Sequence, residues 1–191
     1  MKSVSKRNVY LRIIVYTLFI IGLKTAWWMF LQPVETLEVS EGEVFLKTNK
    51  FDVKTVYNLD GEWAFYPYEL VRPNEINRFD KSFEVVPSNW DVALQNEDES
   101  TIGYGTYHLK IHLPENYTGD IGFYFYDVYT SAKIYVNNKL MGTKGFVSAN
   151  SEDYVGNIQP FSVTYRPNSN EVNLLIQVSN YELPNYAGIL K

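Results

Sequence analysis

Two histidines, His108 and His112, are the first residues of this chain whose type and spacing suggest chemistry. They lie four residues apart in a segment where apolar and polar residues alternate, so a β-strand would place both side chains on one face. Imidazole nitrogens are common ligands of transition metals, but no Asp, Glu or Cys accompanies them in this segment. We therefore expect a solvated polar face beside Lys110, no metal site and no cofactor.

Carboxylates are plentiful, but their placement does not favour catalysis. Glycoside hydrolysis needs two carboxyl groups about 5–10 Å apart, with different protonation states. The acidic runs at 97–99 and 152–153 stand among turn-forming residues, which is typical of solvated loops. A Gly-x-Ser-x-Gly elbow, a phosphate loop and a dinucleotide fingerprint are also missing from the sequence. We therefore expect no catalytic residues and no enzymatic activity in this chain.

Aromatic residues in turn-like segments are better candidates for a functional site. The chain contains 16 Tyr, 11 Phe and 4 Trp, and aromatic rings can stack on sugar C–H surfaces or on the side chains of a partner. Trp90, Tyr104 and Phe146 each stand in a segment rich in Gly, Pro, Ser or Asn. Asn180 adds an amide that can form hydrogen bonds. These four residues form the predicted ligand-binding site, and structural packing is the alternative role for the three aromatic rings.

The elements that must position these residues are predicted to be β-strands. Residues 106–113 and 171–180 alternate in polarity, which predicts two strands with one buried and one solvated face. The inward residues are Tyr107, Leu109, Ile111 and Leu113 in the first strand, and Val172, Leu174, Ile176 and Val178 in the second. Residues 121–128 carry aromatic side chains on both faces, which indicates a strand covered on two sides.

A β-hairpin is predicted for residues 132–142. Its two central residues, Asn137 and Asn138, tolerate the positive φ angles of a type I′ turn. Trp63 and Phe65 alternate in another strand, which favours a place in the core. No run with a helical period follows residue 31, so many short strands predict an all-β, antiparallel sandwich.

The N-terminal segment differs from the rest of the chain. Lys2, Lys6, Arg7 and Arg12 precede the apolar run 13–31, in which only Lys24 is charged. A helix rising about 1.5 Å per residue over this run would cross a hydrocarbon core of about 30 Å. Basic residues before such a helix stay in the cytoplasm. This predicts a cytoplasmic stub at 1–12, a transmembrane signal anchor at 13–31, and export of all that follows. A cleaved signal peptide with the core 13–23 is the alternative, although no small-x-small cleavage pattern follows it.

Charge and cysteine content narrow the class of protein further. Residues 32–191 carry 12 basic and 22 acidic side chains, a net charge of −10, which disfavours a nucleic-acid partner. The sequence has no cysteine, so an exported domain would depend on packing without disulfides. We expect location in the membrane of a bacterial cell, with the N-terminus cytoplasmic and the β domain extracellular.

Four blocks of sequence carry a resemblance to a known family. They are NLDGEWAF at 58–65, VPSNW at 86–90, GYGTY at 103–107 and AKIYVNNK at 132–139. In order and spacing they resemble the N-terminal sugar-binding domain of family 2 glycoside hydrolases. This resemblance implies a galactose-binding-like jelly roll at 57–191, after a stalk and first strand at 32–56. The hydrolases carry their catalytic acids in a separate barrel domain, for which this chain has no room.

The order of segments resembles a second family more closely. A basic start, one anchor, a stalk and a jelly roll are similar to the exported N-terminal region of bacterial sensor histidine kinases with a seven-transmembrane diverse-intracellular-signalling module. The resemblance implies that a membrane bundle and a cytoplasmic output domain follow in the complete receptor. Because the sequence ends at Lys191, where the jelly roll would finish, we expect a fragment of a longer protein.

These observations leave functions of different classes open. The first is an extracytoplasmic ligand-sensing domain of a membrane-anchored bacterial signalling receptor, which binds a carbohydrate or another small molecule. The alternative is a non-catalytic sugar-binding accessory domain of a cell-surface family 2 glycoside hydrolase. A third is a spacer or dimerisation element without a ligand. The expected partners are the lipid bilayer at 13–31, a small ligand, and a protein partner or second copy of the chain.

Overall fold

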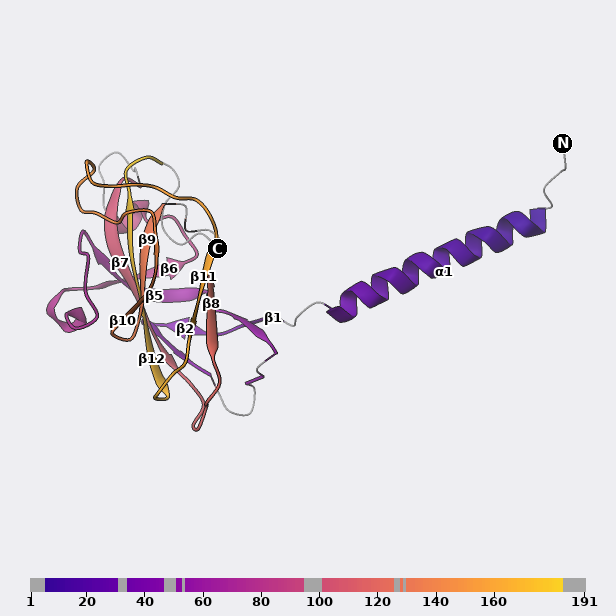
Figure 1. Ribbon diagram of the computed structural model, residues 1–191, viewed down its shortest axis with the longest axis horizontal. Helices are drawn as coiled ribbons and strands as arrows, with labels where there is room; N and C mark the ends of the chain where they lie inside the picture. The colour runs from indigo at the N-terminus through magenta and orange to yellow at the C-terminus, as the bar shows by residue number, and fades with distance from the viewer. Residues whose placement is uncertain are drawn as a thin grey trace. The chain divides into compact units, whose positions relative to one another are not determined.

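The computed structural model describes residues 6–30, 34–46, 51–52, 54–94, 101–125, 128 and 130–183. The chain separates into two compact units (Figure 1). One contains the N-terminal helix, and the other contains Glu35–Asp52 and Tyr57–Lys191. We call the second unit the β domain and describe each unit by itself.

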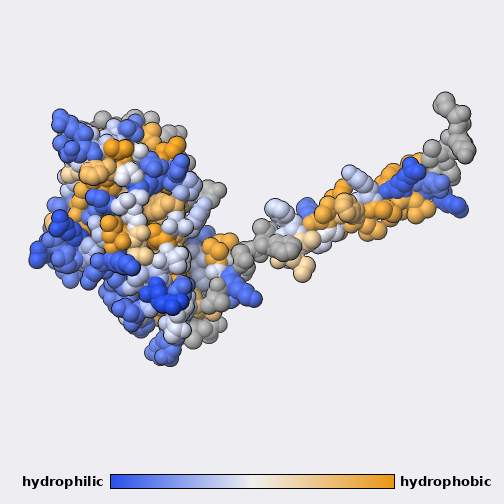
Figure 2. Space-filling model, viewed as in Figure 1, coloured by the Kyte–Doolittle hydropathy of each residue, from blue (hydrophilic) through white to orange (hydrophobic). Residues whose placement is uncertain are grey.

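Helix α1 extends over Lys6–Phe30 and exposes its apolar side chains on every side. Exposure of its large apolar residues ranges from 43% for Val9 to 84% for Met29, and its surface is hydrophobic along most of its length (Figure 2). The hydroxyls of Thr17 and Thr25 donate to backbone carbonyls within the helix. The helix is long and apolar enough to cross a bilayer, and a signal sequence has the same properties.

The helix begins earlier than the predicted anchor. It includes Lys6, Arg7 and Arg12, because long basic side chains have good helix propensity and do not interrupt the backbone ladder. The predicted anchor 13–31 thus lies within α1, except for residue 31, which is outside the described residues.

The β domain is built on an eight-stranded sheet in the order β10-β9-β12-β7-β3-β2-β5-β6, with a further pairing of β7 and β5. Its strands are β2 (Val39–Ser40), β3 (Glu43–Phe45), β5 (Gly61–Pro67), β6 (Ser82–Val86), β7 (Gly103–His112), β9 (Ser131–Val136), β10 (Lys139–Lys144) and β12 (Glu171–Asn180). At its centre, β12 pairs antiparallel with β7 from Glu171↔His112 to Asn180↔Gly103. The other described elements are β1 (Val34–Thr36), β4 (Val56–Asn58), β8 (Ile121–Phe125), β11 (Phe161–Tyr165), the 3-10 helix η1 (Ile76–Arg78) and the helix α2 (Asp91–Leu94).

A second layer of two antiparallel strands, β8 and β11, faces one side of this sheet (Figure 1). Phe123 and Phe125 of β8 and Val163 of β11 belong to the same hydrophobic cluster as the inward residues of β7 and β12. The fold is therefore the predicted β-sandwich preceded by one apolar helix. Trp63 and Phe65 are buried in this core, as their spacing predicted.

The inward residues predicted for β7 and β12 are all buried, which confirms the alternation. The opposite face is solvated only in part: Glu171 is exposed and Lys110 and His112 are partly exposed, but other polar residues of this face are covered. Thr106, Gln177 and Ser179 lie on that opposite face, which we call the outer face, and all three are buried. Periodicity gives the side of the sheet on which a residue lies, but not whether another segment covers that side.

Strand β8 is less covered than predicted. Tyr124 is 64% exposed, whereas Phe123 and Phe125 are buried, so this strand is covered on one face only. Its partner β11 forms the rest of a narrow two-stranded layer, and described residues pack on the inner side of that layer alone. Tyr126 lies outside the described residues.

The hairpin β9–β10 forms with Asn137 and Asn138 as its two-residue loop, as predicted. Its turn is not of type I′, because Asn137 has a φ of 52° while Asn138 does not have a positive φ.

The segment expected to be a stalk and first strand at 32–56 contributes two short strands, β2 and β3, to the large sheet. Within it, β2 pairs antiparallel with β3 and parallel with β5, while β3 pairs parallel with β7. These two strands are short and carry acidic residues, so the sequence pattern resembled a linker, whereas pairing with distant strands gives them their structure.

Candidate functional site

Two of the four residues predicted to bind a ligand lie in the interior instead. Trp90 is 1% exposed, its ring lies parallel to Tyr107, and its Nε1 donates to the carbonyl of Thr101 at 2.8 Å. Asn180 is fully buried and its Nδ2 donates to the same carbonyl at 2.8 Å and to that of Leu183 at 2.7 Å. The structure thus brings Trp90 and Asn180 together around Thr101, where both hold the chain in place.

The other two predicted residues have separate neighbours. Tyr104 lies inside β7 and not in a turn, and its ring meets the edge of Tyr68 with centroids 5.7 Å apart. Phe146 forms an isolated backbone bridge with Val155, and its ring, 51% exposed, lies 5.3 Å from Nζ of Lys133. Phe146 is therefore the most accessible ring of the predicted set.

A different candidate site lies on the outer face of the large sheet, under the segment 68–80, which we call the strap. The strap is attached near its start: the amide of Val71 donates to Oγ1 of Thr106 at 3.0 Å, and Nε2 of Gln177 donates to the carbonyl of Val71 at 2.8 Å. Oγ1 of Thr106 in turn donates to the carbonyl of Glu69 at 2.6 Å. The buried side chains of Thr106 and Gln177 thus each have a hydrogen-bond partner in the strap.

Apolar residues complete the attachment of the strap. Val71 is buried with Ala64 and Tyr66 of β5, and Ile76 and Phe79 pack against this cluster. The cluster is separate from the main core because it lies on the other side of the sheet.

Two adjoining cavities of about 660 and 430 Å³ form a groove between the strap and the sheet. Both are lined by Ile76, Asn77, His108 and Lys110, so the groove is continuous across these residues. Each volume falls within the range of about 300–1,000 Å³ that is usual for small-molecule sites.

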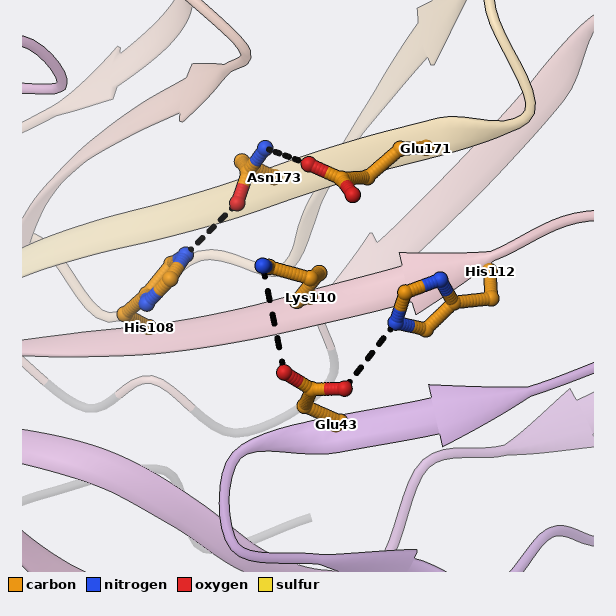
Figure 3. A network of polar contacts seen from close by, with 6 residues as sticks. All are labelled: Glu43, His108, Lys110, His112, Glu171 and Asn173. Atoms are coloured by element: carbon orange, nitrogen blue, oxygen red, sulfur yellow. Dashed lines mark hydrogen bonds and ion pairs between the residues drawn. The ribbon is translucent and has the colours of Figure 1, made fainter.

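A network of polar side chains from β3, β7 and β12 forms part of the groove (Figure 3). Nε2 of His108 lies 2.9 Å from Oδ1 of Asn173, and Nδ2 of Asn173 lies 3.4 Å from Oε1 of Glu171. On the neighbouring strand, Oε1 of Glu43 is 3.8 Å from Nζ of Lys110, and its Oε2 is 3.0 Å from Nε2 of His112. The side chains are therefore held by one another before any ligand arrives.

The chemical state of His108 follows from these contacts. Burial lowers the pKa of His108, and Lys81 and Lys110 act in the same direction, whereas the hydrogen bond to Asn173 and the charge of Glu43 oppose them. The imidazole is therefore neutral at pH 7. Since Oδ1 of Asn173 is an acceptor, Nε2 of His108 carries the proton and Nδ1 is an acceptor.

The two histidines lie on one face of β7, as predicted, but they do not share a ligand site. His108 contacts Asn173, while His112 contacts Glu43 and stacks on Phe45 with ring centroids 4.1 Å apart. The prediction of a solvated His108 is wrong, because this residue is 8% exposed. Among the described residues, no group of three His, Cys, Asp or Glu side chains is placed to hold a metal ion.

The sequence contained only a weak signal for this groove. Its polar residues alternate with core residues along β7 and β12, and such residues are ordinarily solvated. The strap that covers them has no periodic pattern in the sequence. Its hydrogen bond to β12 joins Val71 and Gln177, which are 106 positions apart, so no local pattern predicts it.

Comparison with known proteins finds no matching family model and no matching curated protein. Solved structures similar to this chain include a GH2 β-galacturonidase from Eisenbergiella tayi bound to galacturonate (16% identity, TM-score 0.42, 64% of this chain and 18% of that chain). A β-glucuronidase from Faecalibacterium prausnitzii is similar at 21% identity and a TM-score of 0.45, over 63% of this chain and 20% of that chain. A β-D-glucuronidase from Dictyoglomus thermophilum is similar at 18% identity and a TM-score of 0.45, over 64% and 19%. This chain spans about a fifth of the length of these enzymes.

Proposed function

We propose that this chain is the membrane-anchored, extracytoplasmic ligand-binding part of a bacterial signalling receptor, and that its β domain binds a carbohydrate or another small polar molecule. The observation that carries the proposal is the groove under the strap. Its polar groups are fixed by mutual hydrogen bonds, and His108 is neutral and lies 2.9 Å from Oδ1 of Asn173. Preorganised polar groups in a cavity of this size lower the cost of ordering a bound ligand.

The exposed surface of α1 supports the membrane part of the proposal. Large apolar side chains lie on all sides of the helix, and transfer of such a surface from water to hydrocarbon is strongly favourable. Lys6, Arg7 and Arg12 stand at its N-terminal end, and the positive-inside rule assigns that end to the cytoplasm.

A protease test on cells that express the chain examines this topology. We expect protease added to spheroplasts to degrade the β domain and to leave a small N-terminal fragment protected by the membrane. Degradation only after lysis would exclude an extracytoplasmic β domain. Sequencing the N-terminus of the membrane-extracted protein tests the anchor: the original first residues indicate an anchor, and a new N-terminus beyond residue 23 indicates a cleaved signal peptide.

Ligand binding is tested with the full chain in lipid nanodiscs. We expect isothermal titration calorimetry against a panel of oligosaccharides to show saturable heat for some members, without release of free monosaccharide. Release of monosaccharide would show catalysis and contradict a purely binding role. A flat response to every saccharide would contradict carbohydrate binding and favour the role of a spacer or dimerisation element.

A further inference from the structure

The arrangement of polar groups in the groove limits the chemistry of its ligand. His108, Asn173 and Asn77 present amide and imidazole groups, and Glu43 and Lys110 supply an acceptor and a donor 3.8 Å apart. A hydroxyl group both donates and accepts hydrogen bonds, so adjacent hydroxyls can match such neighbouring pairs. An apolar ligand would displace water from these groups without satisfying their remaining donors and acceptors, and would lose affinity.

The charge of the lining disfavours an anionic ligand. Four carboxylates line the two cavities, namely Glu41, Glu43, Asp80 and Glu171, against the two ammonium groups of Lys81 and Lys110. Burial keeps His108 neutral, and Lys110 already lies beside Glu43. A carboxylate on the ligand would therefore meet a lining of net negative charge.

A flat aromatic surface lies next to the groove on β3. The rings of Phe45 and His112 stack with centroids 4.1 Å apart and planes inclined by 3°. Phe45 is 58% exposed, so this residue is accessible to a ligand. Because residues two apart on a strand share a face, Phe45 lies on the same side of the sheet as Glu43, about 7 Å along the strand. Such a surface is suited to the C–H face of a sugar ring.

We infer that the groove under the strap binds an uncharged saccharide, with His108, Asn173 and Glu43 bonding its hydroxyls and Phe45 stacking on an adjoining sugar ring. The carboxylates Glu43 and Glu171 weaken the binding of sugars that bear a carboxylate. This inference rests on the proposed binding function and adds to it the location of the site and the class of ligand.

Calorimetry of the full chain in nanodiscs tests the inference with two sets of oligosaccharides of equal length. One set contains neutral hexose and pentose oligomers, and the other contains uronic acid oligomers. We expect at least one neutral oligomer to bind, and uronic acid oligomers to bind at least tenfold more weakly. Equal or tighter binding of uronic acid oligomers would overturn the inference while leaving the proposed function intact. The absence of binding by either set would overturn the inference and, with it, the carbohydrate-binding part of the proposed function.

Variants locate the site. Asn173→Ala and Phe45→Ala are each expected to weaken binding of the neutral oligomer about tenfold, which corresponds to about 1.4 kcal/mol. The double variant Glu43→Gln with Glu171→Gln is expected to reduce the ratio of the affinity for neutral oligomers to the affinity for uronic acid oligomers. Glu115→Gln removes one carboxylate from an exposed turn and should leave both affinities unchanged. Thermal unfolding of each variant confirms folding, and unaltered affinity in folded Asn173→Ala and Phe45→Ala would place the site elsewhere and overturn the inference.

Discussion

At the scale of single residues, His108 is a polar side chain that is buried and also hydrogen-bonded. It lies in the central strand of the sheet and is buried, yet it keeps a polar ring with a partner for Nε2. A buried polar group without a hydrogen bond is costly, so Asn173 stabilises the fold as well as the groove. Because burial disfavours the charged imidazolium, protonation of His108 is coupled to folding.

His108 is expected to make the stability of the β domain dependent on pH. Burial lowers its pKa in the folded state, so below about pH 6.5 the unfolded chain binds a proton that the folded protein does not. The contribution of neutral His108 to the free energy of unfolding is therefore complete above pH 6.5. It is lost as the pH falls from 6.5 toward the lowered pKa of the folded state. We expect the loss of melting temperature between pH 7.5 and pH 5.5 to be smaller in His108→Gln, which keeps a donor for Asn173. An identical loss in both proteins would contradict this role of His108.

Gly105 shows how closely the core is packed. A Cβ atom at this position would lie 2.5 Å from Cζ of Phe65, which is completely buried and packed against Trp90 and Tyr107. We expect Gly105→Ala to reduce the free energy of unfolding by about 1–3 kcal/mol, because the added methyl group overpacks the core.

Chemical denaturation of the full chain measures this loss. Gly122→Ala is the matched control, since a Cβ atom there meets nothing within 4 Å. The control should retain or slightly increase stability. Equal stability of the two variants would show that Phe65 yields to the added methyl group.

At the scale of elements, the strap converts a strand face into a groove. Only its first part is attached through buried hydrogen bonds, at Glu69 and Val71, whereas residues 74–77 form one wall of the groove. The position of that wall therefore depends on Thr106 and Gln177, which lie beneath the strap, together with the apolar packing of Ile76. Gln177 is a positioning residue in this arrangement.

Gln177→Leu is expected to loosen the strap while leaving the main core intact. The substitution leaves the carbonyl of Val71 without its donor, at a cost of about 1–3 kcal/mol. We expect faster amide hydrogen exchange at 69–80, measured by mass spectrometry, and little change in β12. Gln159→Leu is the control, because Gln159 lies in an exposed loop. Unchanged exchange at 69–80 in Gln177→Leu would show that apolar packing alone attaches the strap.

At the scale of the whole molecule, the two units have opposite surface chemistry. Helix α1 is apolar on every side, whereas the segment from residue 32 carries a net charge of −10. Each unit therefore suits a different solvent, hydrocarbon for the helix and water for the β domain.

Charges placed in the middle of α1 are expected to release the protein from the membrane. Leu18→Arg combined with Ile21→Arg introduces two residues that each cost about 2.5–3.5 kcal/mol at the centre of a membrane helix. We expect the fraction that resists extraction by alkaline carbonate to fall at least tenfold. Val9→Arg with Tyr10→Arg adds the same charges beside Lys6, Arg7 and Arg12, and should have little effect. Full retention of the first variant would contradict membrane insertion of α1.

Patterns local in the sequence identified the apolar helix, the two central strands, the hairpin and the core around Trp63 and Phe65. These features depend on side-chain periodicity and on hydrophobicity, which neighbouring residues are sufficient to reveal. Turn-like surroundings were the basis for predicting Trp90, Tyr104 and Phe146 as site residues. That criterion cannot distinguish a ring packed inside, such as Trp90, from one at the surface, such as Phe146.

The sequence by itself thus determined the class of fold, the apolar segment and the side of the sheet on which each strand residue lies. Tertiary structure alone decided that β2 and β3 join the large sheet, and that the strap covers the polar face of β7 and β12. Both outcomes depend on contacts between residues far apart in the chain, such as Gln177 with Val71. Such contacts form because distant segments bury one another's apolar and polar groups. The residues neighbouring each segment in the sequence do not predict which segments will meet.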